Sequence, residues 1–391
     1  MTLSEMILMA MPLVWFLWSL FILKPAGTLK FILGWAVLLT GCLALSFFMN
    51  QNLSKVMGGQ WAWSDALYYG WQLFSFVTIL QIIKKVFELA LRRMIRWPLN
   101  ESVRKVLTGC VLYSVLIIII IPFFLGMTSI HRVKIGDVVN PETALAIAYD
   151  DVSLKTRDGL NIKGWFVPAD SDKAVIIAHG LGANKSNFLG TVDMWHQLNV
   201  NVLIFDFRGH GMSDGHTVTF GYRERLDVMA GLNYLIETKK FTADKIIGYG
   251  VSFGGAAMIH AANEMRVFHK IIIDSSFASL DDMADTIVAG EAIIPVFGRK
   301  FFKEIGLFFI RMAVGFDIRE HSPENIVGRL DGTPLLLIHG KGDPLIHWKQ
   351  TQRLYEKAGN PKQVVFLETQ GHFGTMNDAS YVEIIRGFVA N

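Results

Sequence analysis

Residues 248–255 set four glycines around one serine, in the order Gly-Tyr-Gly-Val-Ser-Phe-Gly-Gly. The stretch follows the short apolar run 245–247, which is typical of a buried strand, and precedes residues 256–259, which are typical of a helix. Because glycine lies two positions before and two positions after Ser252, the spacing G-x-S-x-G predicts a sharp strand-to-helix turn with a strained backbone at the serine. Glycines relieve the clash that side chains would cause there. Such a turn lifts the hydroxyl above the sheet and aims the positive end of the helix at it.

A glycine-rich turn between a strand and a helix can instead hold a dinucleotide. That site requires G-x-G-x-x-G, and here Gly248 and Gly250 are followed by Phe253 where the third glycine belongs. The pattern therefore favours an activated serine over a dinucleotide site, and we expect no cofactor.

Apolar and charged residues are unevenly distributed along the chain. Of 391 residues, 52% are hydrophobic and 18% are charged, which is too apolar for an ordinary soluble protein. Residues 1–134 hold 12 of the 37 Lys and Arg but only 4 of the 34 Asp and Glu. The remainder is slightly acidic and lacks the basic stripe that predicts nucleic-acid binding. Both cysteines, Cys42 and Cys110, lie in apolar runs, which excludes a disulfide framework and a cysteine zinc site.

Four apolar runs in the front part contain no charged residue, and each is close to the roughly 20 residues that cross a bilayer. They are residues 6–23, 31–49, 66–83 and 106–126. We expect residues 1–135 to form an all-α membrane anchor of about four transmembrane helices. A cleavable signal peptide is the alternative for the first run, which lacks a basic leader and a clear cleavage site. The third run, with Gln72 and Gln81, is the weakest.

The basic residues predict an orientation for this anchor. Residues 84–105, between the third and fourth runs, carry seven Lys and Arg. Given an even number of spans, the positive-inside rule places this loop in the cytoplasm and both chain ends outside. We expect an integral multi-pass membrane protein, of the bacterial inner-membrane type, with its back domain on the non-cytoplasmic side. Residues 86–97 favour a helix on the anionic leaflet over a solvated connector.

Residues 141–391 alternate between strand and helix patterns, which predicts one α/β domain with a doubly wound, mostly parallel sheet. Expected strands are 145–154, 160–167, 174–178, 200–205, 246–249, 271–273, 335–338 and 364–367, and expected helices are 188–198, 224–237, 348–358 and 381–388. The rhythm breaks at about residues 276–330, where we expect a helical cap over the site. Its many apolar residues either pack on the body, line an acyl-chain tunnel or touch a bilayer.

Catalytic groups in such sheets gather at the carboxyl ends of the strands. Asp343 follows the strand at 335–338, and His372 follows the strand at 364–367. The order Ser252, Asp343, His372 is the one that the turn at the serine requires. A serine hydroxyl becomes a good nucleophile when an imidazole takes its proton, and a carboxylate fixes the tautomer of that imidazole. Asp274 is a rival acid, although Asp-Ser-Ser is more typical of a helix cap.

The turn after the strand at 174–178 reads His179-Gly180-Leu181-Gly182. We expect the backbone N–H of Leu181, together with that of Phe253, to form an oxyanion hole. His179 is more typical of a structural residue that braces this loop. No metal ligands are predicted.

With these motifs, residues 145–391 resemble the α/β-hydrolase superfamily, and within it the membrane-anchored branch of lysophospholipase, monoacylglycerol lipase and depalmitoylase-like enzymes. The resemblance also rests on residues 206–215, a family loop in which Asp206 and Arg208 are expected to be structural. It implies a serine hydrolase that cleaves carboxylic esters or thioesters of acyl lipids through an acyl-enzyme on Ser252. A peptidase, an acyltransferase and a non-catalytic membrane receptor or scaffold remain alternatives, and the oligomeric state stays open.

Overall fold

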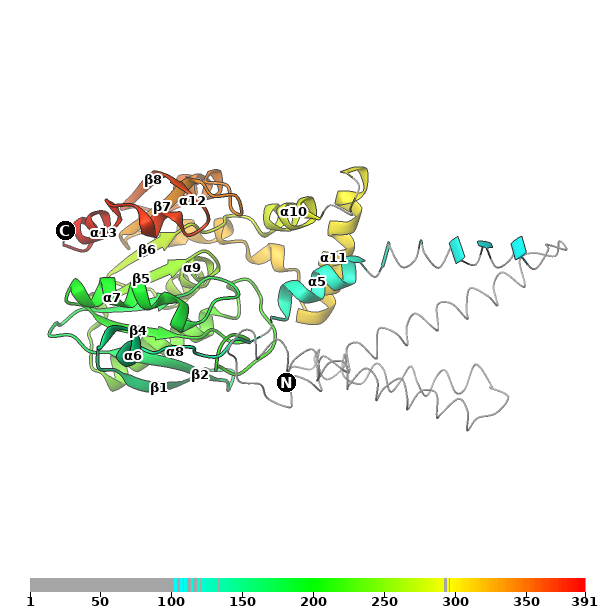
Figure 1. Cartoon of the computed structure of the whole chain (residues 1–391). Helices are drawn as coiled ribbons and strands as arrows, with labels where there is room; N and C mark the ends of the chain where they lie inside the picture. The colour runs from blue at the N-terminus through cyan, green and yellow to red at the C-terminus, as the bar shows by residue number, and fades with distance from the viewer. Residues whose placement is uncertain are drawn as a thin grey trace, which may run out of the picture. The chain divides into compact units, whose positions relative to one another are not determined.

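Short apolar runs build one eight-stranded sheet, as the computed structural model shows (Figure 1). The structure describes residues 134–291, 294 and 296–390, residues 121–132, and nine positions between 102 and 119. Gly126–Arg311 and Phe316–Asn391 form one compact unit. The strand order in the sheet is β1-β2-β4-β3-β5-β6-β7-β8. The strands are β1 (Asp150–Lys155), β2 (Asn161–Val167), β3 (Ala174–Ala178), β4 (Asn201–Phe205), β5 (Ile246–Val251), β6 (Lys270–Asp274), β7 (Leu335–Gly342) and β8 (Lys362–Gln370).

The sheet is mostly parallel, as the alternating pattern predicts. β1 pairs antiparallel with β2, and β2 pairs antiparallel with β4. The five remaining pairings are all parallel. Parallel strands end at the same edge of a sheet, so the turns after β3, β5, β6, β7 and β8 all open at the carboxyl edge.

Helices cover both faces of the sheet. One face packs on α7 (Leu189–Gln197) and α13 (Tyr381–Ala390), and the other on α8 (Arg225–Asn233), α9 (Phe253–Met265) and α12 (Lys349–Lys357). Along β3, Ile176 lies in the core beside α8 and α9, whereas Val175 and Ile177 lie in the core beside α7. Because helices cover both faces of the sheet, the central strands consist of continuous apolar residues and do not alternate between apolar and polar residues.

The entry to the sheet differs from the strand that we expect at 145–154. Residues Pro141–Leu145 form a short helix, α6, because Asn140 and Thr143 make a capping box. The Thr143 N–H donates to the Asn140 side chain at 2.8 Å, and the Asn140 N–H donates to the Thr143 hydroxyl at 3.1 Å. Ala146, at φ 57°, then ends the helix in the left-handed region. Strand pairing therefore begins only at Asp150. The helix expected at 224–237 likewise changes at Tyr234 into a π-helical turn, Tyr234–Thr238.

The cap segment, residues 276–330, lies between β6 and β7. It contains α10 (Leu280–Gly290), α11 (Arg299–Val314) and the 3-10 turns Val296–Gly298, Ile318–His321, Pro323–Asn325 and Val327–Arg329. α10 is capped by Ser279, whose hydroxyl accepts from the Asp282 N–H at 3.2 Å. The Asp-Ser-Ser stretch that we expect to act as a cap, residues 274–276, ends three residues before Ser279 and does not cap α10.

The described residues also include α5 (Ile121–Ile130), which holds the last residues of the fourth apolar run. Within the described part of the chain, no helix is long and apolar enough to cross a membrane. The first three runs, eight of the 21 residues of the fourth and the helix expected at 86–97 lie outside the described residues. The division at residues 135 and 141 between anchor and hydrolase domain therefore stays a prediction.

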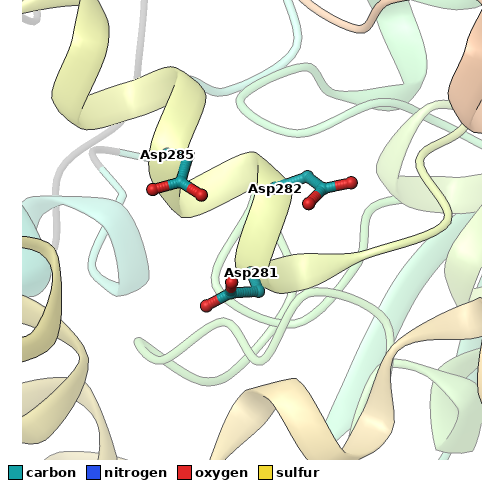
Figure 2. Close-up of side chains that lie close together, drawn as sticks. All are labelled: Asp281, Asp282 and Asp285. Carbon is teal, nitrogen blue, oxygen red and sulfur yellow. The ribbon is translucent and has the colours of Figure 1, made fainter. Parts of the chain in front are cut away.

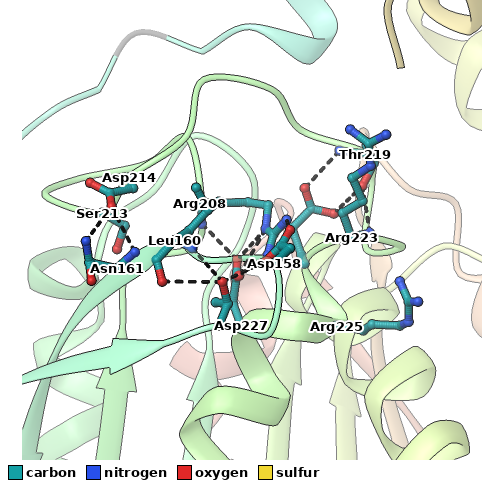
Figure 3. Close-up of polar contacts among 12 residues, drawn as sticks. Asp158, Leu160, Asn161, Arg208, Ser213, Asp214, Thr219, Arg223, Arg225 and Asp227 are labelled. Carbon is teal, nitrogen blue, oxygen red and sulfur yellow. Dashed lines mark hydrogen bonds and ion pairs between the residues drawn. The ribbon is translucent and has the colours of Figure 1, made fainter. Parts of the chain in front are cut away.

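Two buried cations hold the loops at the carboxyl edge. The Lys185 ammonium, 2% exposed, lies 2.7 Å from Asp206 and 2.6 Å from Asp137, in the linker that precedes α6. The Arg208 guanidinium pairs with Asp227 and Asp158, each at 2.7 Å, and its backbone N–H also donates to Asp227 (Figure 3). Asp206 and Arg208 thus brace the loop after β4, because buried charges are stable only when they are paired.

We expect Lys185→Ala to lower the free energy of unfolding by about 3–5 kcal/mol, because it leaves the fully buried Asp206 carboxylate unpaired. Lys245→Ala is the matched control. It breaks an ion pair with Asp172 at 2.8 Å, but these two side chains are 36% and 68% exposed, so the expected loss is below about 1 kcal/mol. Guanidinium unfolding followed by circular dichroism measures both. Equal losses contradict the structural role of Lys185.

Candidate active site

The turn at Ser252 has the strained geometry that its sequence predicts. β5 ends at Val251, α9 begins at Phe253, and Ser252 between them lies at φ 55° and ψ −119°. A side chain at Gly254 would overlap the carbonyl oxygen of Ala178, and a Cβ atom at Gly250 would lie 2.7 Å from the carbonyl oxygen of Gly254. Only glycine fits at both positions. The backbone N–H of Ser252 donates to the Asp274 carbonyl at 2.8 Å, which fixes the turn to β6.

Asp343 and His372 lie together at the ends of β7 and β8. The His372 Nδ1–H donates to Asp343 Oδ2 at 2.6 Å, and the backbone N–H groups of Leu345 and Ile346 donate to Asp343 Oδ1 at 2.8 and 3.0 Å. Burial alone raises the pKa of Asp343, but hydrogen bonds from His339, His372 and Ile346 outweigh it and hold that pKa well below its usual range. The ionised carboxylate therefore keeps the proton of His372 on Nδ1 and leaves Nε2 free to act as a base.

His339 is a second histidine on the same carboxylate. Its Nε2 lies 3.3 Å from Asp343 Oδ2 and donates to the Ile346 carbonyl at 2.8 Å, while its Nδ1 accepts from the Thr351 hydroxyl at 2.6 Å. His339 is fully buried. The Ile346 carbonyl can only accept, so the proton of neutral His339 lies on Nε2, the nitrogen nearest the Asp343 carboxylate. The sequence places His339 next to the site but gives no sign of this role, because the contact to Thr351 depends on how α12 packs.

The loops that carry Ser252 and His372 meet at Gly180. A Cβ atom on Gly180 would lie 3.8 Å from Ser252 Cβ and 3.4 Å from Cζ of Phe373, the neighbour of His372. Among the described residues no hydrogen bond joins the Ser252 hydroxyl to His372. In ligand-free sites this bond is often long and tightens when substrate binds.

The backbone N–H groups of Leu181 and Phe253, expected as the oxyanion hole, donate to no protein acceptor within the described residues. Two neutral histidines shape the loop around Leu181. His210 accepts from the Gly182 N–H at 3.1 Å and donates to the Arg208 carbonyl at 3.0 Å. His179 donates to the Gly180 carbonyl at 2.8 Å and accepts from the Phe207 N–H at 3.0 Å. Burial lowers the pKa of His179, and it lowers the pKa of His210 to about 3.

The rival acid Asp274 contacts groups other than His372. Its carboxylate accepts from the hydroxyls of Ser275 at 2.8 Å, Thr375 at 2.8 Å and Tyr381 at 2.6 Å. Burial raises its pKa, because the side chain is fully enclosed. Asp274 thereby anchors the turn that follows His372 through Thr375, a contact that the sequence does not reveal.

Three carboxylates in the first turns of α10, those of Asp281, Asp282 and Asp285, lie within 4.8 Å of one another (Figure 2). They already have cationic partners. Lys303 lies 3.0 Å from Asp281 and 2.9 Å from Asp285, and Arg353 pairs with Asp282. This cluster therefore joins α10 to α11 and to α12, and we assign no metal ion to it.

A family profile described as the Alpha/beta hydrolase family matches residues 175–384, which span β3 to α13 and every candidate site residue. The chain belongs to the α/β hydrolase family. Ser252, Asp343 and His372 occupy the turns after the fifth, seventh and eighth strands of this hydrolase.

Among its relatives, YqkD of Bacillus subtilis is 32% identical over 60% of this chain and 76% of its own, and YfhR of Escherichia coli K12 is 27% identical over 59% and 75%. The Saccharomyces cerevisiae protein YNL320W, described as a membrane protein, is 23% identical over 64% and 83%. Among solved structures, the Pyrococcus furiosus esterase Pf2001 superposes with a TM-score of 0.56 at 24% identity, over 66% of this chain and 98% of its own. At that identity the likeness shows the fold alone.

We expect Gly254→Ala to destabilise the hydrolase by about 3 kcal/mol, because its methyl group meets the Ala178 carbonyl, which belongs to the sheet and cannot move away. Gly190→Ala in α7 is the control. Nothing lies within 4 Å of a Cβ atom there, so the change should be neutral or stabilise by up to about 1 kcal/mol. Differential scanning calorimetry of the two variants decides the point. Equal melting temperatures would show that the turn has room for a side chain.

The lowered pKa of His210 predicts acid sensitivity of the fold. In the unfolded chain a histidine binds a proton near pH 6.5, whereas folded His210 stays neutral down to about pH 3. Between these values the unfolded state binds more protons, so the free energy of unfolding falls as the pH falls. We expect a loss on the order of 3 kcal/mol between pH 6.5 and pH 4 from this residue. Urea unfolding across this range should show a shallower dependence for His210→Gln, whose amide accepts the same bond without titrating; parallel curves contradict the assignment.

Proposed function

We propose that the chain is a serine hydrolase that cleaves carboxylic esters or thioesters of acyl lipids. Ser252 is the nucleophile, His372 the general base and acid, and Asp343 the carboxylate that orients His372. The observation that carries this proposal is the 2.6 Å hydrogen bond from His372 Nδ1 to an ionised Asp343, in a loop that meets the strained turn of Ser252.

The proposed reaction has two halves. His372 Nε2 takes the proton of Ser252 while the serine oxygen attacks the acyl carbonyl, and the N–H groups of Leu181 and Phe253 bind the oxyanion that forms. Collapse of this intermediate breaks the bond to the alcohol or thiol, which leaves with the proton from His372. A water molecule, deprotonated by His372, then attacks the acyl-enzyme, and the carboxylic acid departs as Ser252 regains its proton.

The front part of the chain supports a substrate that resides in a membrane. Residues 1–135 contain four uncharged runs of bilayer length, and the relative YNL320W is described as a membrane protein. We propose that this part anchors the hydrolase of residues 141–391 in a membrane as a multi-pass protein, with the site on the non-cytoplasmic side. An anchored enzyme meets amphiphilic esters at high local concentration, which favours acyl lipids over soluble esters.

Covalent labelling with a fluorophosphonate probe tests the proposal. We expect the wild-type chain to be labelled and to hydrolyse a medium-chain acyl ester, and Ser252→Ala to lose both properties, because no other hydroxyl occupies the strained turn. Ser153→Ala is the control, since Ser153 lies on β1 at the edge of the sheet and should label like wild type. Asp343→Asn leaves the nucleophile Ser252 in place, but kcat should fall about 10⁴-fold, because His372 then adopts the wrong tautomer. A wild-type chain that takes up no probe indicates an inert scaffold.

A further inference from the structure

The cap helix α11 carries apolar residues on two sides. Phe302, Leu307 and Ile310 are each 6% exposed and pack inward. On the other side, Phe301 is 52% and Phe308 55% exposed, and Phe297, in the turn that leads into the helix, is 93% exposed. A cap helix that only packs on its domain needs one apolar side, so the inward residues leave the outward ones unexplained.

The outward apolar residues lie on one side of α11 and in the turn before it, and the exposed Glu304, which pairs with Arg319, lies beside them. Phe301, Ile305 and Phe308 follow one another at intervals of four and three residues, the spacing at which side chains align along one side of a helix, and Phe297 lies four residues earlier, in the turn Val296–Gly298. We call these four residues the outer stripe. Single exposed apolar side chains are common on proteins, but a contiguous apolar strip usually marks a surface that meets something apolar.

The end of the fourth apolar run lies against this same helix. A Cβ atom on Gly126, the last residue of that run, would lie 2.8 Å from the carbonyl oxygen of Gly306 and 3.4 Å from Ile310. The two backbones are therefore in direct contact, and the contact uses the inner side of α11. The point at which the chain leaves the proposed membrane segment thus coincides with the helix that bears the outer stripe.

Charges beside the stripe suit a lipid surface. Lys300 and Arg311 are exposed near the two ends of α11. Cationic side chains flanking exposed aromatic residues are typical of helices that lie in the interface of a bilayer with anionic lipids. We propose that the outer stripe inserts into the interfacial layer of the bilayer that holds the anchor, so that α11 lies on the membrane. This proposal rests on the membrane anchor of the proposed function and is independent of the catalytic assignment.

Site-specific fluorescence in the full chain tests this surface. Cys42→Ser and Cys110→Ser remove the native thiols, and Phe297→Cys then carries an environment-sensitive NBD label. Asp172→Cys is the control, because Asp172 is 68% exposed and precedes β3, at the edge of the sheet opposite the site. Both proteins are reconstituted into phosphatidylcholine and phosphatidylglycerol vesicles. We expect head-group nitroxide lipids to quench the label at 297 about twofold more than the label at 172, and aqueous iodide to quench only the latter.

The other results distinguish failure of the membrane surface from failure of the catalytic assignment. Iodide quenching at 297 equal to that at 172 shows that the stripe stays in water. Protection at 297 from both quenchers shows that protein covers it, either another part of this chain or a second copy. A chain that does not float with the vesicles contradicts the anchor and the docking surface together. Loss of ester hydrolysis with lipid quenching intact contradicts only the catalytic proposal.

Discussion

The approach of Gly254 to the last carbonyl of β3 is the constraint on which the site depends. Because α9 begins with no space between its backbone and Ala178, the turn of Ser252 and the loop of Leu181 are fixed against each other. The same closeness forces Ser252 into a backbone conformation that side-chain-bearing residues rarely adopt. A strained backbone conformation persists only where the surrounding structure holds it in place. The paired parallel strands β3 and β5 hold the turn at Ser252.

Around this rigid core, His179, His210 and Asp343 are each hydrogen-bonded in a single protonation state. His179 and His210 are neutral, and a neutral imidazole can donate through one nitrogen and accept through the other. That property lets them tie backbone carbonyl and N–H groups of adjacent loops together without a buried charge. Asp343 is the opposite case. It is charged and enclosed, and it is stabilised by two histidines and two backbone N–H groups rather than by a cation.

The sequence predicts the mostly parallel sheet and the sharp turn at Ser252, but it does not predict the residues that hold the candidate site in position. Strand periodicity and the glycine spacing around Ser252 depend on local geometry, so they predict the parallel sheet and the turn directly. The support from His339, His210 and Thr375 comes instead from contacts between segments up to about a hundred residues apart, and no local pattern encodes it. The predicted start of the first strand at residue 145 was wrong for a local reason. The capping box of Asn140 stabilises a short helix at Pro141–Leu145, which the apolar pattern alone does not predict.

The linker between the front part and the sheet reaches the edge that holds the site. The Ile130 carbonyl accepts from the Val218 N–H at 2.8 Å, and the Lys134 ammonium donates to the Ser213 carbonyl at 2.8 Å. The Asn184 side chain donates to the Ile135 carbonyl at 2.9 Å. These partners belong to the loops after β3 and β4, which also hold Leu181 and His210. A chain tethered only for localisation could enter the domain at any surface. Entry through bonds to these loops brings the carboxyl edge, the cap helix α11 and the end of the fourth apolar run together, so the front part of the chain joins the domain beside the candidate site.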